Sequence, residues 1–157
     1  MGRQSGVTLI ELVISIVVMS IALTGTLLSI RAATRASVDP MILHQATAIS
    51  EAYLEEILLK PFYDPDTGSG GGVCPSAEAS RSLYDNVCDY QAVDDAGPRD
   101  QNGSSIAGLS GYRVRVAVDT SATLGALAGS SQVLRVDVRV THSDLVDLSI
   151  SAYRTNY

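Results

Sequence analysis

The hydrophobic pattern of the chain opens with a long uninterrupted block. Leu12 to Ile30 runs for nineteen residues without an ionisable side chain. At about 1.5 Å per residue, a helix of that length spans roughly 28 Å, close to the ~30 Å hydrocarbon thickness of a bilayer. The block therefore predicts a transmembrane helix over residues 7–30, with an acidic residue, Glu11, near its start.

Residues 31–60 keep the helical period but become amphipathic. The apolar stripe consists of Ile42, Ala46, Ile49, Tyr53 and Ile57, and Glu51, Glu55 and Glu56 sit mostly off it. This spacing predicts a second helical half whose apolar face packs on a globular domain, in preference to lining a ligand groove. Asp39-Pro40 predicts a kink or a fresh helix start, and Lys60-Pro61 predicts the helix end.

The C-terminal part, residues 112–157, alternates apolar and polar positions. Three stretches, 112–118, 134–140 and 146–152, predict strands with one apolar face. The short link His142-Ser143-Asp144 predicts a hairpin between the last two. Such a sheet needs a partner layer, and the amphipathic helix is the one available. The pattern therefore predicts an α+β fold in which one long N-terminal helix packs on a small antiparallel sheet.

Residues 61–111 predict an irregular loop region. The glycine run 69–72 has no phosphate-loop lysine after it, so it indicates a flexible loop and not a nucleotide site. Residues 94–103 are rich in oxygen ligands but lack the spacing of an EF-hand loop. A solvated acidic turn is the favoured interpretation there, and a calcium site remains the alternative.

Composition narrows the classes of function. The chain has 157 residues and a net charge of −6, so it offers no basic face for nucleic acid. Its two histidines, His44 and His142, do not adjoin a plausible serine or cysteine nucleophile in sequence, and we expect a non-enzymatic protein without a cofactor.

The six residues before the apolar block form a short polar leader. Met1 to Gly6 carries one basic residue, Arg3. A secretory signal places its small-residue cleavage site after the apolar stretch, whereas here the available glycine precedes it. The order GVTLIEL resembles the type IV pilin and type II secretion pseudopilin superfamily. The resemblance implies a prepilin peptidase that cuts between Gly6 and Val7 and then methylates the new amino terminus; Val7 stands where most members have Phe.

Glu11 has two interpretations that can coexist. Thr8 and Glu11 fit a capping box, in which the two side chains satisfy free backbone N–H groups at a helix start. In the family that the chain resembles, the matching glutamate is thought to pair with the amino terminus of a neighbouring subunit. A carboxylate at membrane depth is stabilised by an opposite charge, which favours this assembly role.

Cys74 and Cys88 are the only cysteines, fourteen positions apart and without a histidine cluster. Zinc needs about four ligands, and two cysteines are too few to bind it without further ligands. We expect a disulfide outside the cytoplasm, worth about 3 kcal/mol in the chain-entropy model, in preference to two free thiols.

Later segments resemble the D-type minor pilins of the mannose-sensitive haemagglutinin (MSHA) pilus system. They are residues 44–46, 52–57, 83–87 and 108–112. The resemblance implies a subunit that initiates or caps a surface pilus used for attachment. It also implies a single-pass inner-membrane protein with a periplasmic C-terminal domain, in contact with the bilayer, other pilin subunits and the assembly platform. A minor pseudopilin of a type II secretion system, or a membrane-anchored periplasmic binding domain, remains the alternative.

Overall fold

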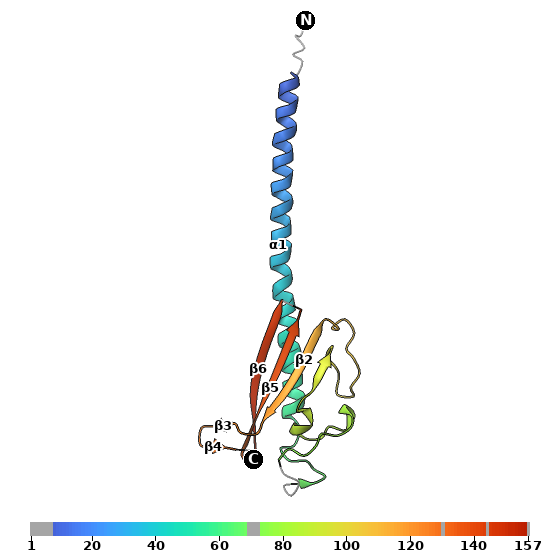
Figure 1. The fold of residues 1–157 in the computed structure, drawn as a ribbon, viewed down its shortest axis with the longest axis vertical. Coiled ribbons are helices and arrows are strands. Elements are labelled where there is room, and N and C mark those ends of the chain that lie inside the picture. Colours follow the sequence, from blue (N-terminus) through green and yellow to red (C-terminus); the bar gives the residue numbers. More distant parts are fainter. Residues whose placement is uncertain (1–7, 69–72, 130, 144, 157) are drawn as a thin grey trace. The chain divides into compact units, whose positions relative to one another are not determined.

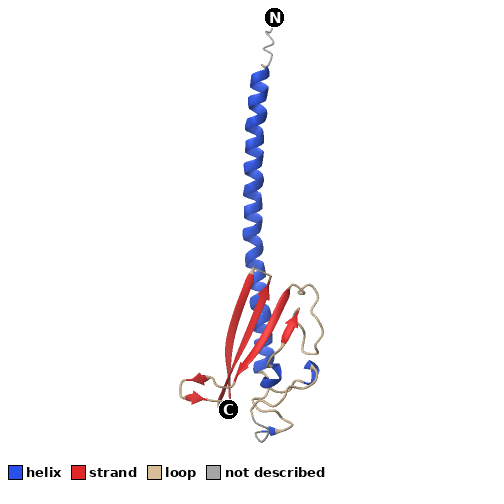
Figure 2. Cartoon of the chain, in the orientation of Figure 1, coloured by secondary structure: helices blue, strands red, loops and turns tan. Residues whose placement is uncertain are grey.

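The computed structural model describes residues 8–68, 73–129, 131–143 and 145–156, and covers only the backbone at residues 31–39. The chain divides into two compact units, residues 1–41 and residues 42–157. Figure 2 shows one long helix and a set of strands joined by loops. This content confirms the predicted α+β class.

Helix α1, Leu9–Leu58, is continuous and contains Pro40 in its interior. The fresh helix start predicted at Asp39-Pro40 is therefore wrong. A proline removes one backbone donor from a helix but leaves the turns on either side intact, so a helix can run through it. The boundary between the two units nevertheless falls close by, between Met41 and Ile42.

The main sheet is antiparallel with strand order β1-β2-β5-β6. Its strands are β1 Asp94–Ala96, β2 Tyr112–Asp119, β5 Val133–His142 and β6 Val146–Thr155, and a separate small pair consists of β3 Thr123–Leu124 and β4 Leu127–Ala128. Strands β5 and β6 pair from Val133 opposite Thr155 to His142 opposite Val146, which confirms the hairpin. Three of the four main strands follow the predicted stretches.

The core lies between the sheet and the C-terminal part of α1, which run side by side in Figure 1. Strand β2 buries every second residue and β5 contributes a row of valines, while all five residues of the predicted helix stripe are buried. The stripe is thus confirmed as core packing. Glu56, which the pattern places mostly off the apolar stripe, is only 9 % exposed and lies inside the unit.

The loop region contains more structure than its sequence indicated. It holds two short 3₁₀ turns, η2 Arg81–Leu83 and η3 Val87–Tyr90, and strand β1. Strand β1 begins the acidic stretch that was predicted to be a turn throughout, and the turn itself is confined to the part around Asp100, whose carbonyl accepts from Gly103 N at 2.9 Å. Short strands without alternation, such as Asp94–Ala96, carry no periodic signal.

Gly111 fixes the entry into β2. A Cβ atom at this position would lie 2.7 Å from His142 Nε2, and the His142 ring packs on the Tyr112 ring with centroids 4.5 Å apart. The Tyr112 hydroxyl in turn donates to Gln45 Oε1 of α1 at 2.6 Å. This close approach connects the β5–β6 turn, β2 and the helix.

Candidate functional site

The first unit presents an apolar helical surface that no part of the described chain covers. Leu9–Ile30 is long and apolar enough to cross a membrane, with a mean hydropathy of 2.3, and none of its most apolar window is buried. The large side chains along it are at least 46 % exposed. Exposed apolar area on this scale costs free energy in water, so it indicates a surface covered by lipid or by other apolar helices.

Four hydroxyl side chains within this span are hydrogen-bonded to the backbone of the same helix. The hydroxyls of Ser15, Ser20, Thr24 and Thr26 each donate to the carbonyl four residues earlier, at 2.7–2.9 Å. A polar group in hydrocarbon is costly unless it is hydrogen-bonded. These hydroxyl groups are therefore compatible with a helix that crosses a membrane.

Thr8 and Glu11 meet at the start of α1. Glu11 N donates to Thr8 Oγ1 at 3.3 Å, and Thr8 N donates to Glu11 Oε2 at 3.5 Å. These are the two contacts of a capping box. Both residues are exposed, and none of the ion pairs within the described residues includes Glu11, so its charge has no partner inside this part of the chain. The predicted processing residues, Gly6 and Val7, lie outside the described residues.

The second unit holds a buried cluster of charged and phenolic side chains. The guanidinium of Arg81, whose side chain is 7 % exposed, contacts Asp95 Oδ2 at 2.8 Å and Glu56 Oε2 at 3.2 Å. The hydroxyl of Tyr53 donates to Asp95 Oδ2 at 2.8 Å, and that of Tyr90 donates to Glu56 Oε1 at 2.6 Å. The cluster joins α1, η2, η3 and β1.

The phenols of this cluster act as hydrogen-bond donors that hold its carboxylates in place. Burial, partly offset by the hydrogen bond from Arg99 N, raises the pKa of Tyr53 to about 12, and burial with the Glu56 hydrogen bond raises the pKa of Tyr90 as well. Both phenols therefore stay protonated donors at neutral pH. The Arg81 guanidinium also lies 4.5 Å from the centre of the Tyr53 ring, within cation–π range. Sequence analysis missed the cluster because its partners are far apart along the chain and show no period.

The disulfide between Cys74 and Cys88 is present, with 5.1 Å between the Cα atoms. Neither cysteine is free. The bond closes the loop that leads from the glycine run to η3. The predicted pairing is confirmed.

In the acidic stretch 94–103, two of the carboxylates are already paired with arginines. Arg113 holds the Asp94 carboxylate through two hydrogen bonds, at 2.6 and 2.7 Å, and Arg81 holds that of Asp95. These arginines occupy oxygens that a calcium ion would need. His44 is exposed on α1 and His142 packs on a tyrosine ring.

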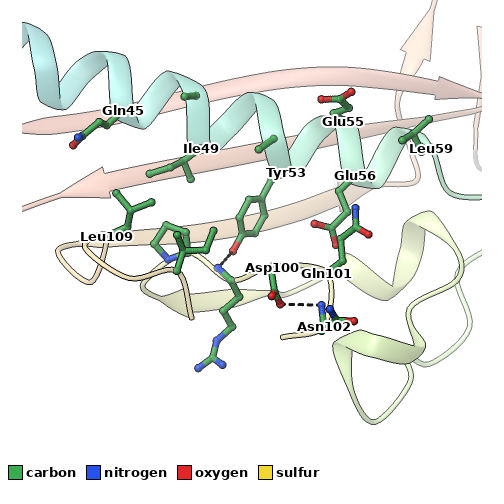
Figure 3. Close-up of a pocket in the computed structure, with 15 residues that line it drawn as sticks. Gln45, Ile49, Tyr53, Glu55, Glu56, Leu59, Asp100, Gln101, Asn102 and Leu109 are labelled. Carbon is green, nitrogen blue, oxygen red and sulfur yellow. Dashed lines mark hydrogen bonds between the residues drawn. The ribbon is translucent and has the colours of Figure 1, made fainter. Parts of the chain in front are cut away.

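An open groove of about 800 Å³ runs along α1 in the second unit. Figure 3 shows Gln45, Ile49 and Tyr53 on the helix side, with Leu109 and Asp100 on the loop opposite. The loop is tied to the helix by Arg99 N, which donates to the Tyr53 hydroxyl at 2.9 Å. The groove thus shares two side chains, Tyr53 and Glu56, with the buried cluster.

Among the comparisons with known proteins, one finds a match, and it lies within the first unit. Residues 1–27 match the family model of the prokaryotic N-terminal methylation motif. No curated protein and no solved structure shows significant similarity to the chain. The matched segment includes the leader, the Gly6-Val7 junction, Thr8 and Glu11, and most of the apolar block.

This motif supports a place for the chain in the type IV pilin-like superfamily, as a pilin or a pseudopilin. It implies processing by a prepilin peptidase and assembly with other pilin subunits. The single apolar N-terminal helix suits membrane anchoring before incorporation into a pilus.

Proposed function

We propose that the chain is a minor type IV pilin of the MSHA kind, a non-catalytic structural subunit that takes part in initiation or tip assembly of a surface pilus used for attachment. The observation that carries the proposal is the uncovered apolar helix Leu9–Ile30, which follows the methylation motif directly. In the membrane this helix contacts lipid, and in a filament it contacts the equivalent helices of other subunits. The C-terminal unit lies in the periplasm before assembly, a placement that the disulfide supports.

Glu11 is the proposed assembly residue, supported by Thr8, which orients it through the capping box. Its exposed carboxylate has no ion-pair partner in the described chain, and the freed amino terminus of a neighbouring subunit supplies the opposite charge. A charge at membrane depth is costly, so pairing it stabilises the assembled state more than the free one.

Two substitutions separate the charge of Glu11 from its cap. Glu11→Ala removes both, and Glu11→Gln keeps a capping acceptor but removes the charge. Both variants should be inserted, cleaved and folded, and both should fail to support filaments when cells are examined by electron microscopy. Thr8→Ala removes the cap alone, at a cost of about 1 kcal/mol, and should retain filaments. Normal piliation with Glu11→Gln would overturn the ion-pair mechanism.

A minor pseudopilin of a type II secretion system is the second candidate, because the methylation motif supports both classes. Deletion of the gene distinguishes them: loss of surface pili with normal enzyme secretion indicates the pilin, and the reverse indicates the pseudopilin. A membrane-anchored binding domain, the third candidate, requires neither Gly6 nor Glu11. Retention of the leader in wild-type cells that contain the peptidase would favour it.

A further inference from the structure

Strand β6 forms one edge of the main sheet and is paired on one side. It follows β5 in the strand order and pairs with β5 over its whole length, from Val146 to Thr155. Figure 1 shows β6 at the outer side of the sheet. In the described part of the chain, no backbone-to-backbone hydrogen bond outside this ladder involves residues 147–155. The outer edge of β6 therefore presents backbone N–H and C=O groups that pair with no strand of the described residues.

The opposite edge of the sheet shows how an edge strand is protected. Strand β1 is three residues long, and two of these, Asp94 and Asp95, are charged and paired with arginines. Strand β6 is ten residues long, its register with β5 is continuous, and it contains no proline, glycine or lysine. Residues 148–153 carry no charge. A long, regular and uncharged edge of this kind is a template for pairing with another strand.

The inward face of β6 is also incompletely covered. Its apolar side chains Leu148, Ile150 and Ala152 are half-buried, whereas the three β5 valines directly opposite them are fully buried. These valines are Val140, Val138 and Val136. The buried core therefore ends at β6, where one flank of the apolar row is accessible to solvent. A further strand with apolar side chains at alternate positions would cover this flank.

We propose that β6 binds an extended segment of a partner protein, which adds a strand to the main sheet. The backbone of β6 supplies the hydrogen bonds, and the row Leu148, Ile150 and Ala152 selects a segment with apolar residues at every second position. Strand β5, in which buried valines alternate with charged residues, shows the kind of segment that fits β6. The inference concerns the second unit alone and applies to a pilin and a pseudopilin alike.

A second copy of the chain fits this edge less well. Antiparallel pairing of two β6 strands requires a two-fold axis normal to the sheet, and this axis would make the two copies of α1 run in opposite directions. Helices anchored in one membrane by the same span, Leu9–Ile30, run in the same direction. The partner segment therefore belongs to another protein, and self-association through β6 is the outcome that the test must distinguish.

A synthetic peptide of residues 133–142, the sequence of β5, is the probe. Titrated into the full-length chain in detergent, it should bind one to one, and hydrogen–deuterium exchange should become slower within β6. Two N-methylated peptides test the two edges of the probe, one modified at positions 136, 138 and 140 and the other at positions 135, 137 and 139. Successive amides of a strand point to opposite sides, so one modified peptide should bind at least about tenfold more weakly and the other should bind normally.

The matched change in the protein is Ile150→Lys, because a charge on the inward face of an edge strand opposes strand addition. This variant should bind the peptide at least about tenfold more weakly. Ala117→Lys adds the same charge on the exposed face of β2 and should bind as the wild type does. Thermal unfolding without peptide checks that both variants fold, and the modified peptides test the proposal on the unaltered wild-type chain.

Three results of the titration would overturn the proposal. They are the absence of saturable binding up to about 1 mM peptide, equal binding of the two N-methylated peptides, and slower exchange in the groove along α1 instead of in β6. Analytical ultracentrifugation of the chain without peptide tests the second copy as occupant. A dimer that forms in the wild type and disappears in Ile150→Lys would assign the edge to self-association and would also overturn the proposal.

Discussion

The two units of the chain differ in where their apolar surface finds a partner. In residues 42–157, the inward faces of α1, β2 and β5 bury one another, and many of these side chains are wholly inaccessible. In the first unit, none of the most apolar window of Leu9–Ile30 is buried by the described chain. The second unit therefore buries its own apolar surface. The apolar surface of the first unit needs lipid or other subunits to cover it.

Polar groups divide in the same way. In the second unit, charges such as Arg81, Glu56 and Asp95 are satisfied across long sequence separations. In the first, the hydroxyls of Ser15, Ser20, Thr24 and Thr26 each donate to a carbonyl one helical turn back, and the Glu11 carboxylate accepts from Thr8 N three residues away. Substitutions in the first unit should therefore change maturation and assembly, and substitutions in the second should change stability.

The largest effect is expected at Gly6, where the outcome is all or none. Gly6→Phe should leave the leader Met1 to Gly6 attached, because a bulky side chain at the cleavage site blocks the peptidase. Intact-mass measurement of the membrane-extracted protein reads the result directly. Ser5→Ala, a small change one residue away, should be processed normally. If Gly6→Phe is cleaved as efficiently as wild type, the proposed junction is misplaced.

Within the second unit, Arg81→Met should give the largest loss of stability. The substitution keeps much of the side-chain bulk but leaves Glu56 and Asp95 buried without their cation, at a cost of about 3–5 kcal/mol. The matched control is Arg139→Met: Arg139 and its partner Asp147 have side chains 51 % and 56 % exposed, so its removal should cost about 0–1 kcal/mol.

Urea unfolding of both variants in detergent, followed by circular dichroism, measures the difference. Equal losses in the two variants would mean that the buried cluster contributes no more than a surface ion pair. The contrast between buried and exposed charges in this unit would then be without energetic meaning.

The features behind the Gly6 and Arg81 predictions differ in how far the sequence alone indicates them. The apolar block, the helix stripe and the alternating strands could all be predicted because each repeats with a local period. Strand β1, the burial of Glu56 and the Arg81 cluster could not, since they depend on contacts between residues such as Glu56 and Arg81 that are twenty-five positions apart. The disulfide could be predicted only because the chain has two cysteines and hence one possible pairing.

Reduction of the Cys74–Cys88 bond should have the next largest effect. The chain-entropy model gives a loss of about 3 kcal/mol for a loop of this size. Unfolding curves with and without reductant provide the measurement. In the double variant Cys74→Ser/Cys88→Ser, reductant should change nothing, which separates the bond from other effects of the reagent. An unchanged wild-type curve, with reduction verified by alkylation, would show that the loop is held without the bond.

A smaller effect is expected at Gly25, in the middle of the apolar span. A Cβ atom there meets nothing within 4 Å inside the chain, so Gly25→Leu should insert and fold normally. It should reduce the number of pili, because glycine permits close approach between helices. Gly25→Ala raises helix propensity by about 1 kcal/mol with little added bulk and should assemble well. Full piliation with leucine would show that this position does not face another subunit.

The smallest effect is expected at the exposed edge of the sheet, where Asp94 on β1 pairs with Arg113 on β2. The hydrogen bonds from Arg113 are the main reason that the pKa of Asp94 is lowered from 3.8 to about 2. A depressed carboxyl pKa adds stability above the unfolded-state pKa, and this contribution disappears as the pH falls from about 4 to about 2.

The unfolding temperature of wild type should therefore exceed that of Asp94→Asn at about pH 4, and this gap between the two temperatures should close at about pH 2. Because the pair is exposed, the gap should be small and should shrink further at high salt. Glu51→Gln, which removes an exposed carboxylate elsewhere in the unit, should follow the wild-type curve. A gap that persists at the lowest pH would mean that Asp94 acts through the geometry of β1, because its charge is then neutralised. Edge-strand pairing, not electrostatics, would then hold this end of the sheet.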